Sequence, residues 1–241
     1  MIIAEVGLNH LGVPKLAHLY VDKLIATDID AITFQVREED YYLNDKEKYL
    51  LEEKTYIELV RKVHSNGKQL GIAIADVSKI EFFEKIKIDF YKVIRNDIRN
   101  IELIDRLIET NKKLIISTGT CSEDEISTFI AKYNQHNITI NHTQLSYDIE
   151  DCNLSAIKTL REKFKVNVSY GSHCKDSKVL YMALAFNPTD ILFYVKAYEF
   201  SLWPDNKHSV TLEQAEVIIS DLKRLSAAVG TGTKEQMEIK L

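Results

Sequence analysis

Short apolar stretches alternate with amphipathic ones along the whole chain. The apolar stretches are rich in Ile, Val, Leu and Phe, as buried strands are, and they cover residues 2–12 (with the turn that ends this stretch), 31–36, 70–75, 90–94, 113–119, 137–143, 166–171 and 191–198. Between them, apolar residues recur at helical spacing over residues 13–26, 45–66, 78–85, 101–110, 154–163, 177–185 and 211–228. One further helix is expected after Ser122, a typical N-cap that precedes two glutamates.

This alternation predicts an α/β fold, a single (β/α)8 TIM barrel. Eight strand–helix units in a chain of 241 residues have the count and length of that fold, which is typically about 250 residues long. A doubly wound open sheet is the alternative, but it usually carries a GxGxxG motif after its first strand, and that motif is missing. We therefore expect a barrel over residues 1–228 and a short tail over residues 229–241.

Polar residues recur near the carboxyl ends of the expected strands. In a barrel, side chains of one parity point inward, and functional groups gather at this end. The inward candidates are Glu5, Gln35, Lys92, Ser117, Ser169 and Lys196, and His173 follows the seventh strand. Asn141 and His142 have opposite parities, so only one of them points inward. Lysines, hydroxyls and histidines at one mouth suit an anionic, oxygen-rich small molecule, and Glu5 suits a general acid or base.

The composition argues against several classes of partner. The net charge of −5 does not favour nucleic acid or an anionic membrane surface. No apolar run approaches the roughly 18 residues of a membrane span, and the first residues do not resemble a signal peptide, so a cytoplasmic location is expected. Three widely spaced cysteines, Cys121, Cys152 and Cys174, indicate free thiols in a reducing compartment.

Seven ordered motifs resemble the N-acetylneuraminate (sialic acid) synthase family. They are IAEVGLNHLG, TFQVREEDYY, YKVIRNDIRNIELI, IISTGTCSEDEI, EDCNLSAI, VSYGSHC and WPDNKHS, which keep their order over residues 2–225. The resemblance implies a transferase of sialic acid biosynthesis that condenses phosphoenolpyruvate with an N-acyl aldose to a nonulosonic acid and releases phosphate. It also implies Mn(II) or Mg(II) as the cofactor, and a homodimer.

The motifs show which residues of this chain correspond to the family's site residues. Glu5 corresponds to the carboxylate near the reacting centre, Gln35 to a sugar-contacting amide, and Asp205 to a residue near the sugar. Lys92 and Ser117 correspond to residues that hold phosphoenolpyruvate, and His173 to the first of two metal-binding histidines. The remaining candidates for substrate binding are Asn9, Arg95, Ser169 and Lys196.

The chain also departs from the family pattern. The second metal-binding histidine falls on Ala197, which leaves His142 or His208 as the candidate second ligand. Where the family has a lysine in the second strand, this chain has Thr33. Where the family has a serine after the fourth strand, this chain has Arg95, which can restore one positive charge. The family's C-terminal antifreeze-like domain, on which its dimers partly depend, has no counterpart in this sequence.

Two other functions therefore stay open beside the synthase. One is a catalytically degenerate relative that binds a sugar-like ligand or a partner. The other is a Schiff-base aldolase that uses Lys92 or Lys196, because burial inside a barrel lowers the pKa of a lysine.

Overall fold

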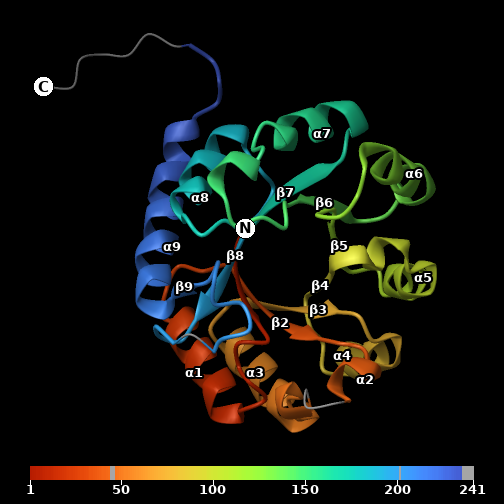
Figure 1. Cartoon of the computed structure of the whole chain (residues 1–241), viewed down its shortest axis with the longest axis vertical. Helices are drawn as coiled ribbons and strands as arrows, with labels where there is room; N and C mark the ends of the chain where they lie inside the picture. The colour runs from red at the N-terminus through yellow and green to blue at the C-terminus, as the bar shows by residue number, and fades with distance from the viewer. Residues whose placement is uncertain (44–46, 201, 235–241) are drawn as a thin grey trace, which may run out of the picture.

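A computed structural model of the protein describes residues 1–43, 47–200 and 202–234. Parallel strands β1 to β8 pair in chain order, and β1 also pairs with β8, so the sheet closes into a barrel. The strands are β1 (Ile2–Gly7), β2 (Ala31–Val36), β3 (Gln69–Ile74), β4 (Phe90–Val93), β5 (Lys113–Ser117), β6 (Ile138–His142), β7 (Asn167–Ser172) and β8 (Ile191–Lys196). The predicted (β/α)8 barrel is confirmed, with its strands inside a ring of helices (Figure 1).

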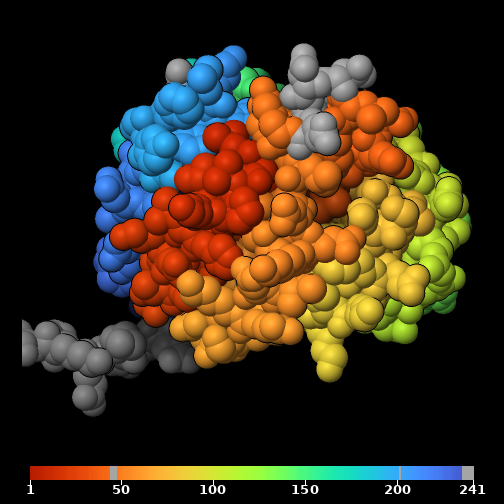
Figure 2. All heavy atoms as spheres, turned by 90° about the horizontal axis from the view of Figure 1, so that it is seen from below, coloured from red at the N-terminus to blue at the C-terminus, as the bar shows by residue number. Residues whose placement is uncertain are grey.

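Each connection between neighbouring strands carries a helix on the outside of the barrel. The helices are α1 (Pro14–Ile25), α3 (Glu53–Ser65), α4 (Ile80–Lys85), α5 (Ile101–Glu109), α6 (Glu123–Tyr133), α7 (Ala156–Phe164) and α8 (Lys178–Ala183), and α9 (Leu212–Ser226) follows β8. Ser122 caps α6 in a capping box with Glu125, as the sequence predicts. Closure of the barrel brings the first and last helices together, and the red and blue ends of the chain lie side by side in Figure 2.

The predicted helix over residues 45–66 is wrong at its start. Within the described residues, α3 begins only at Glu53, after the short helix α2 (Glu39–Tyr42) and a 3-10 turn at Glu47–Tyr49. The backbone near Lys48 and Leu50 packs against the first βα turn, where a Cβ added to Gly12 would lie 2.1 Å from the Lys48 carbonyl oxygen. This contact between distant segments decides where the helix starts, and residues 45 and 46 lie outside the described residues.

Two apolar clusters form the core. The larger fills the layer between the barrel and its helices. The smaller lies inside the barrel and consists of Ile3, Ala31, Phe90, Ile115 and Leu192. Two positions further along the same five strands, the inward side chains are polar: Glu5, Thr33, Lys92, Ser117 and Tyr194. The barrel interior therefore has an apolar layer nearer the start of the strands and a polar layer nearer their ends, and the polar layer faces the mouth.

The end of the chain leaves the barrel after α9. A 3-10 turn spans Ala227–Val229, and residues 230–234 are exposed without helix or strand; the rest of the predicted tail, residues 235–241, lies outside the described residues. Within the described ranges, no helix is long and apolar enough to cross a membrane.

Candidate active site

Glu5 and Lys92 form a buried ion pair at the level of the polar layer. The ammonium group of Lys92 donates to Oε1 of Glu5, and both side chains are only 3% exposed. The other carboxylate oxygen of Glu5, Oε2, is buried and has no hydrogen-bond partner. Such a pair is costly to bury, and one acceptor remains available to a ligand at the centre of the mouth.

Asp205, in the segment after β8, lies against this pair. Burial, and next the negative charge of Glu5, raise the pKa of Asp205 to about 7. The approach requires a glycine on β1: Gly7 has a φ of +56°, and a Cβ there would lie 2.7 Å from Oδ2 of Asp205 and 3.1 Å from the ring of Tyr194. Asp205 is thus suited to exchange a proton near neutral pH.

Two histidines meet beside Tyr194. The ring centroids of His173 and His208 are 4.7 Å apart, and the ring of Tyr194 lies 5.4 Å from the first and 4.6 Å from the second. Burial is the main cause that lowers the pKa of His173 to about 3 and that of His208 to about 4. Both imidazoles are therefore neutral at pH 7, the form that binds a metal ion.

The hydrogen bonds of the two histidines differ. Nδ1 of His173 lies 2.9 Å from Oγ1 of Thr143, which fixes the orientation of the ring. Both ring nitrogens of His208 are buried and make no hydrogen bond, while Nε2 lies 3.9 Å from Oδ1 of Asp205. The His208 ring stacks on Tyr147, which is 40% exposed. Buried ring nitrogens that make no hydrogen bond cost free energy. A ligand that binds His208 would remove this cost.

His142, the other candidate for a second ligand, is not in this cluster. Its Nε2 lies 3.1 Å from the carbonyl oxygen of Cys152, and its ring packs against Tyr170 in the outer core. Asn141 is the residue of β6 that points inward, where it accepts a hydrogen bond from Ser169. Within the described residues, no group of three or more His, Cys, Asp or Glu side chains converges as a metal site, so His173 and His208 stand as a pair.

Three of the predicted substrate-binding residues make hydrogen bonds to other groups of the protein. Asn9 is fully buried, donates to the Val195 carbonyl oxygen at 2.8 Å, and accepts from the backbone N–H of Asp205 at 3.1 Å. Ser169 is also fully buried and donates to Asn141. Lys196 is 6% exposed and donates to Glu199 and to the side chain of Asn206. Asn9 therefore positions Asp205 by tying the segment after β8 to the end of β1.

The remaining predicted residues line the mouth. Gln35 is half-buried on β2, and Ser117 is 5% exposed at the end of β5. The Arg95 side chain is 51% exposed after β4, and its guanidinium group lies 3.7 Å from Glu38. The functional cluster also contains Tyr194, which the sequence analysis did not select, although its parity matches that of Lys196.

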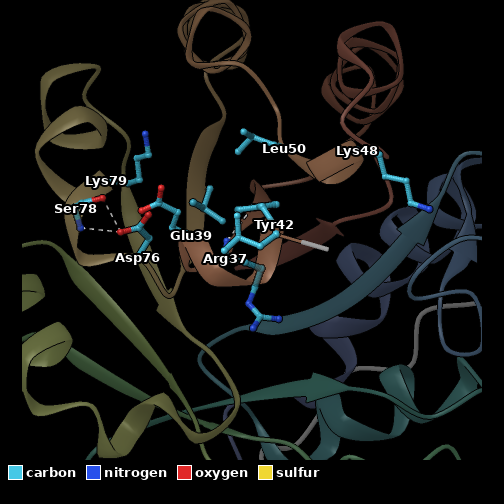
Figure 3. Close-up of a pocket in the computed structure, with 10 residues that line it drawn as sticks. Arg37, Glu39, Tyr42, Lys48, Leu50, Asp76, Ser78 and Lys79 are labelled. Atoms are coloured by element: carbon cyan, nitrogen blue, oxygen red, sulfur yellow. Dashed lines mark hydrogen bonds between the residues drawn. The ribbon is translucent and has the colours of Figure 1, made fainter. Parts of the chain in front are cut away.

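A pocket of about 920 Å³ opens beside this cluster at the ends of β2 and β3 (Figure 3). Its walls include Arg37, Tyr42, Lys48, Asp76 and Lys79. Neither Glu5 nor Lys92 is among its lining residues, whereas Arg37 at the end of β2 is. Its volume lies within the range of small-molecule sites, roughly 300–1,000 Å³.

Comparisons with known proteins agree with this architecture. Residues 12–234 match the NeuB family. The chain is 24% identical to N,N'-diacetyllegionaminic acid synthase of Campylobacter jejuni, over 98% of this chain and 79% of that protein. It is 23% identical to N-acetylneuraminate-9-phosphate synthase of Mus musculus, over 97% of this chain and 72% of that protein.

A solved structure with the same fold is N-acetylneuraminic acid (sialic acid) synthetase of Leptospira borgpetersenii in complex with citrate. It superimposes with a TM-score of 0.90 at 26% identity, over 98% of this chain and 87% of that chain. A truncated 3-deoxy-D-arabino-heptulosonate 7-phosphate synthase of Thermotoga maritima, with a TM-score of 0.71 and 16% identity over 95% of this chain and 87% of that chain, shares the fold. Because the family match spans nearly the whole chain, the protein belongs to the NeuB family.

Proposed function

We propose that this protein condenses phosphoenolpyruvate with an N-acyl aldose to a nonulosonic acid and releases phosphate. Membership of the NeuB family, with relatives named as legionaminic, pseudaminic and sialic acid synthases, supports a function of this type. The observation that carries the proposal is the buried Glu5–Lys92 pair with Asp205 beside it at the barrel mouth. A structural core has no need of three ionisable groups in this place.

The reaction forms one carbon–carbon bond and consumes one water. The methylene carbon of phosphoenolpyruvate bonds to the aldehyde carbon, whose oxygen takes up a proton. Water adds to the carbon that carries the phosphate ester and loses one proton. Phosphate then leaves with the ester oxygen and takes up the second proton of that water, whose oxygen becomes the keto oxygen. Asp205, with a pKa of about 7, is suited to pass one of these protons, and the free Oε2 of Glu5 is suited to accept a hydrogen bond from the substrate. Lys92, whose charge is balanced by Glu5, can still donate a hydrogen bond to a substrate oxygen.

Residues around this centre would bind the sugar and the remaining groups of phosphoenolpyruvate. Gln35 would contact the aldose, and Ser117 and Lys196 would hold oxygen atoms of the substrates. Asn9 and Ser169 act through their neighbours, as positioning residues, because their hydrogen bonds end inside the protein.

A divalent metal fits the histidine pair in its chemistry. His208 has two buried nitrogens without hydrogen-bond partners, and burial keeps it and His173 neutral. Imidazole donors suit Mn(II) better than Mg(II), which prefers oxygen. We therefore propose that His173 and His208 would hold Mn(II), with affinity limited by having two protein donors. Such an ion supplies Lewis-acid polarisation of the aldehyde oxygen.

The test measures phosphate release and metal content on the same preparations. The protein is incubated with phosphoenolpyruvate, Mn(II) and a panel of N-acyl aldoses, and metal is measured after equilibrium dialysis against Mn(II). We expect phosphate with at least one sugar, and Mn(II) retention that His173→Ala and His208→Ala reduce while His142→Ala leaves it unchanged. No phosphate with any sugar, together with no retained metal, overturns the proposal. Ligand binding without phosphate release would point instead to the degenerate relative.

The aldolase alternative makes a different prediction for Lys92. A Schiff base needs the Lys92 nitrogen to be free to attack a carbonyl carbon, whereas this nitrogen donates to Glu5 in a buried ion pair. Treatment with borohydride and a keto acid should therefore leave the protein mass unchanged, and a stable adduct on Lys92 or Lys196 would favour the aldolase.

A further inference from the structure

Three charged side chains converge above the barrel mouth, from the ends of β2 and β4. The guanidinium group of Arg37 forms two hydrogen bonds with the carboxylate of Glu38, through Nε at 2.9 Å and through Nη2. On the other side, Nη2 of Arg95 lies 3.7 Å from Oε1 of the same carboxylate. Glu38 is thus shared by two arginines from different strands.

The strand register places this cluster directly above the catalytic candidates. Gln35 on β2, Ala73 on β3 and Lys92 on β4 lie at one level. Arg37 follows Gln35 by two positions and Arg95 follows Lys92 by three, which puts both about one layer nearer the mouth. Between them β3 contributes only the small residue Ala73 at the lower level, so side chains from β2 and β4 have room to meet.

Arg37 is held in a fixed position at the edge of the pocket. It is 5% exposed, and its guanidinium carbon lies 4.1 Å from the centre of the Tyr41 ring. Figure 3 shows its side chain pointing away from Asp76 and Lys79 on the far wall. Burial is the main cause that raises the pKa of Tyr41, and the positive charge of Arg37 opposes that shift, as expected for a guanidinium group stacked on the ring.

The charge balance singles out this cluster. Lys92 is neutralised by Glu5, and Lys196 is paired with Glu199. Arg37 and Arg95, in contrast, share one carboxylate.

Asp97 is the further acidic group near this cluster. Burial is the main cause that raises its pKa, the charge of Arg95 opposes that shift, and its Oδ2 is buried without a hydrogen-bond partner. Among the direct ion pairs of this cluster, two guanidinium groups share the single half-exposed carboxylate of Glu38, and a subsite for an anion requires such an excess of cationic donors.

A purely structural salt bridge explains these features poorly. Ion pairs between solvent-exposed groups contribute little to stability, and the Glu38 and Arg95 side chains are 43% and 51% exposed. Arg95 also has a φ of +49°, a left-handed conformation that is unfavourable for a residue with a Cβ. This strained residue is the one whose guanidinium group reaches Glu38 from the end of β4.

We propose that Arg37 and Arg95 form the subsite for the phosphate group of phosphoenolpyruvate, and that Glu38 is an internal counter-ion which the phosphate displaces. The proposal rests on the function proposed above and names the residues that replace the positive charge missing at Thr33. Bidentate guanidinium groups match phosphate geometry, and Glu38 can turn into solvent because its side chain is already 43% exposed.

Isothermal titration calorimetry with phosphoenolpyruvate, and separately with inorganic phosphate, tests this assignment. Arg37→Gln and Arg95→Gln should each weaken both ligands by about 10- to 100-fold, as expected for the loss of a charge-assisted contact. Glu38→Gln should tighten both by about 3- to 10-fold, because it removes the competing carboxylate. Arg37→Lys should recover only part of the affinity, since it keeps the charge without the fork. Arg106→Gln and Glu109→Gln, in an exposed pair on α5, are the matched controls and should change nothing.

The outcomes separate this proposal from the proposed function. Phosphoenolpyruvate binding that is indifferent to Arg95→Gln and unchanged or weaker in Glu38→Gln overturns the subsite alone. No phosphoenolpyruvate binding by the parent protein overturns both. Circular dichroism spectra check that each variant is folded, and Arg95→Gln, at an exposed side chain, keeps the test decisive if an Arg37 variant does not fold.

Discussion

The Glu5–Lys92 pair should show a large and strongly non-additive effect on stability. Lys92→Met removes the partner of a carboxylate whose side chain is 3% exposed and whose Oε2 already lacks a hydrogen bond. Breaking one half of a buried ion pair costs about 3–5 kcal/mol, because the remaining charge stays buried without compensation. Glu5→Gln leaves the ammonium group unpaired and should cost a similar amount.

The double variant Glu5→Gln, Lys92→Met contains no buried charge at this position. Its loss of stability should therefore be smaller than the sum of the single losses, by about 2 kcal/mol or more. The surface pair Glu123–Lys163, with side chains 50% and 53% exposed, is the matched control. The same cycle there should give a coupling below about 1 kcal/mol.

Urea unfolding, followed by the fluorescence of the single tryptophan, measures these free energies. Trp203 is 3% exposed in the segment after β8, so its emission reports on the integrity of the mouth. If Lys92→Met costs no more than Lys163→Met, or if the two buried substitutions are additive, the inference that the mouth holds a desolvated ion pair is refuted.

Three further predictions concern the loop that carries Asp205. Gly7→Ala should lower the free energy of unfolding by about 1–3 kcal/mol, measured by urea unfolding, because the new Cβ meets Asp205 at 2.7 Å and the φ of +56° is strained; an unchanged stability would contradict the close approach. Asn9→Ala should cost about 1–3 kcal/mol by the same assay, since it leaves buried partners unsatisfied, and a loss no greater than that of an exposed asparagine variant such as Asn66→Ala would argue against its positioning role. The folded pKa of His208, about 4, lies below its ordinary 6.5, so stability falls as pH drops from 6.5 towards 4, and His208→Gln should reduce the loss between pH 7 and 5 by about 2 kcal/mol. The folded pKa of Asp205, about 7, lies above its ordinary 3.8, so its protonation stabilises the fold over the same interval, and Asp205→Asn should steepen the loss; parallel pH profiles of both variants and the parent would refute these assignments.

The strand pattern and its parity were readable from the sequence alone. Strands buried on both sides must be apolar, and side chains alternate along them, so an interior Glu5 or Lys92 stands out without any structure. The predicted barrel is confirmed, and the inward parity of Glu5, Lys92 and Ser117 holds. The ordered motifs indicated the family because most of them lie at or just after strand ends, where this fold gathers functional groups.

Local pattern was insufficient where distant segments meet. The start of α3 depends on a contact between Gly12 and the backbone near Lys48, which helical periodicity does not contain. The choice between His142 and His208 beside His173 depends on which way β6 and the segment after β8 face. Strand parity does not decide whether Asn141 or His142 of β6 points inward. It does not apply to His208, which lies outside the strands.

By itself, then, the sequence determined the barrel, its inward polar layer and the family, because these follow from periodicity and residue type within single strands. Only the tertiary structure decided which charges neutralise one another: Lys92 with Glu5, Lys196 with Glu199, and Arg37 and Arg95 with one shared Glu38. Ion pairing depends on distances of a few ångströms between residues up to 87 positions apart, and such distances exist only once the sheet has closed.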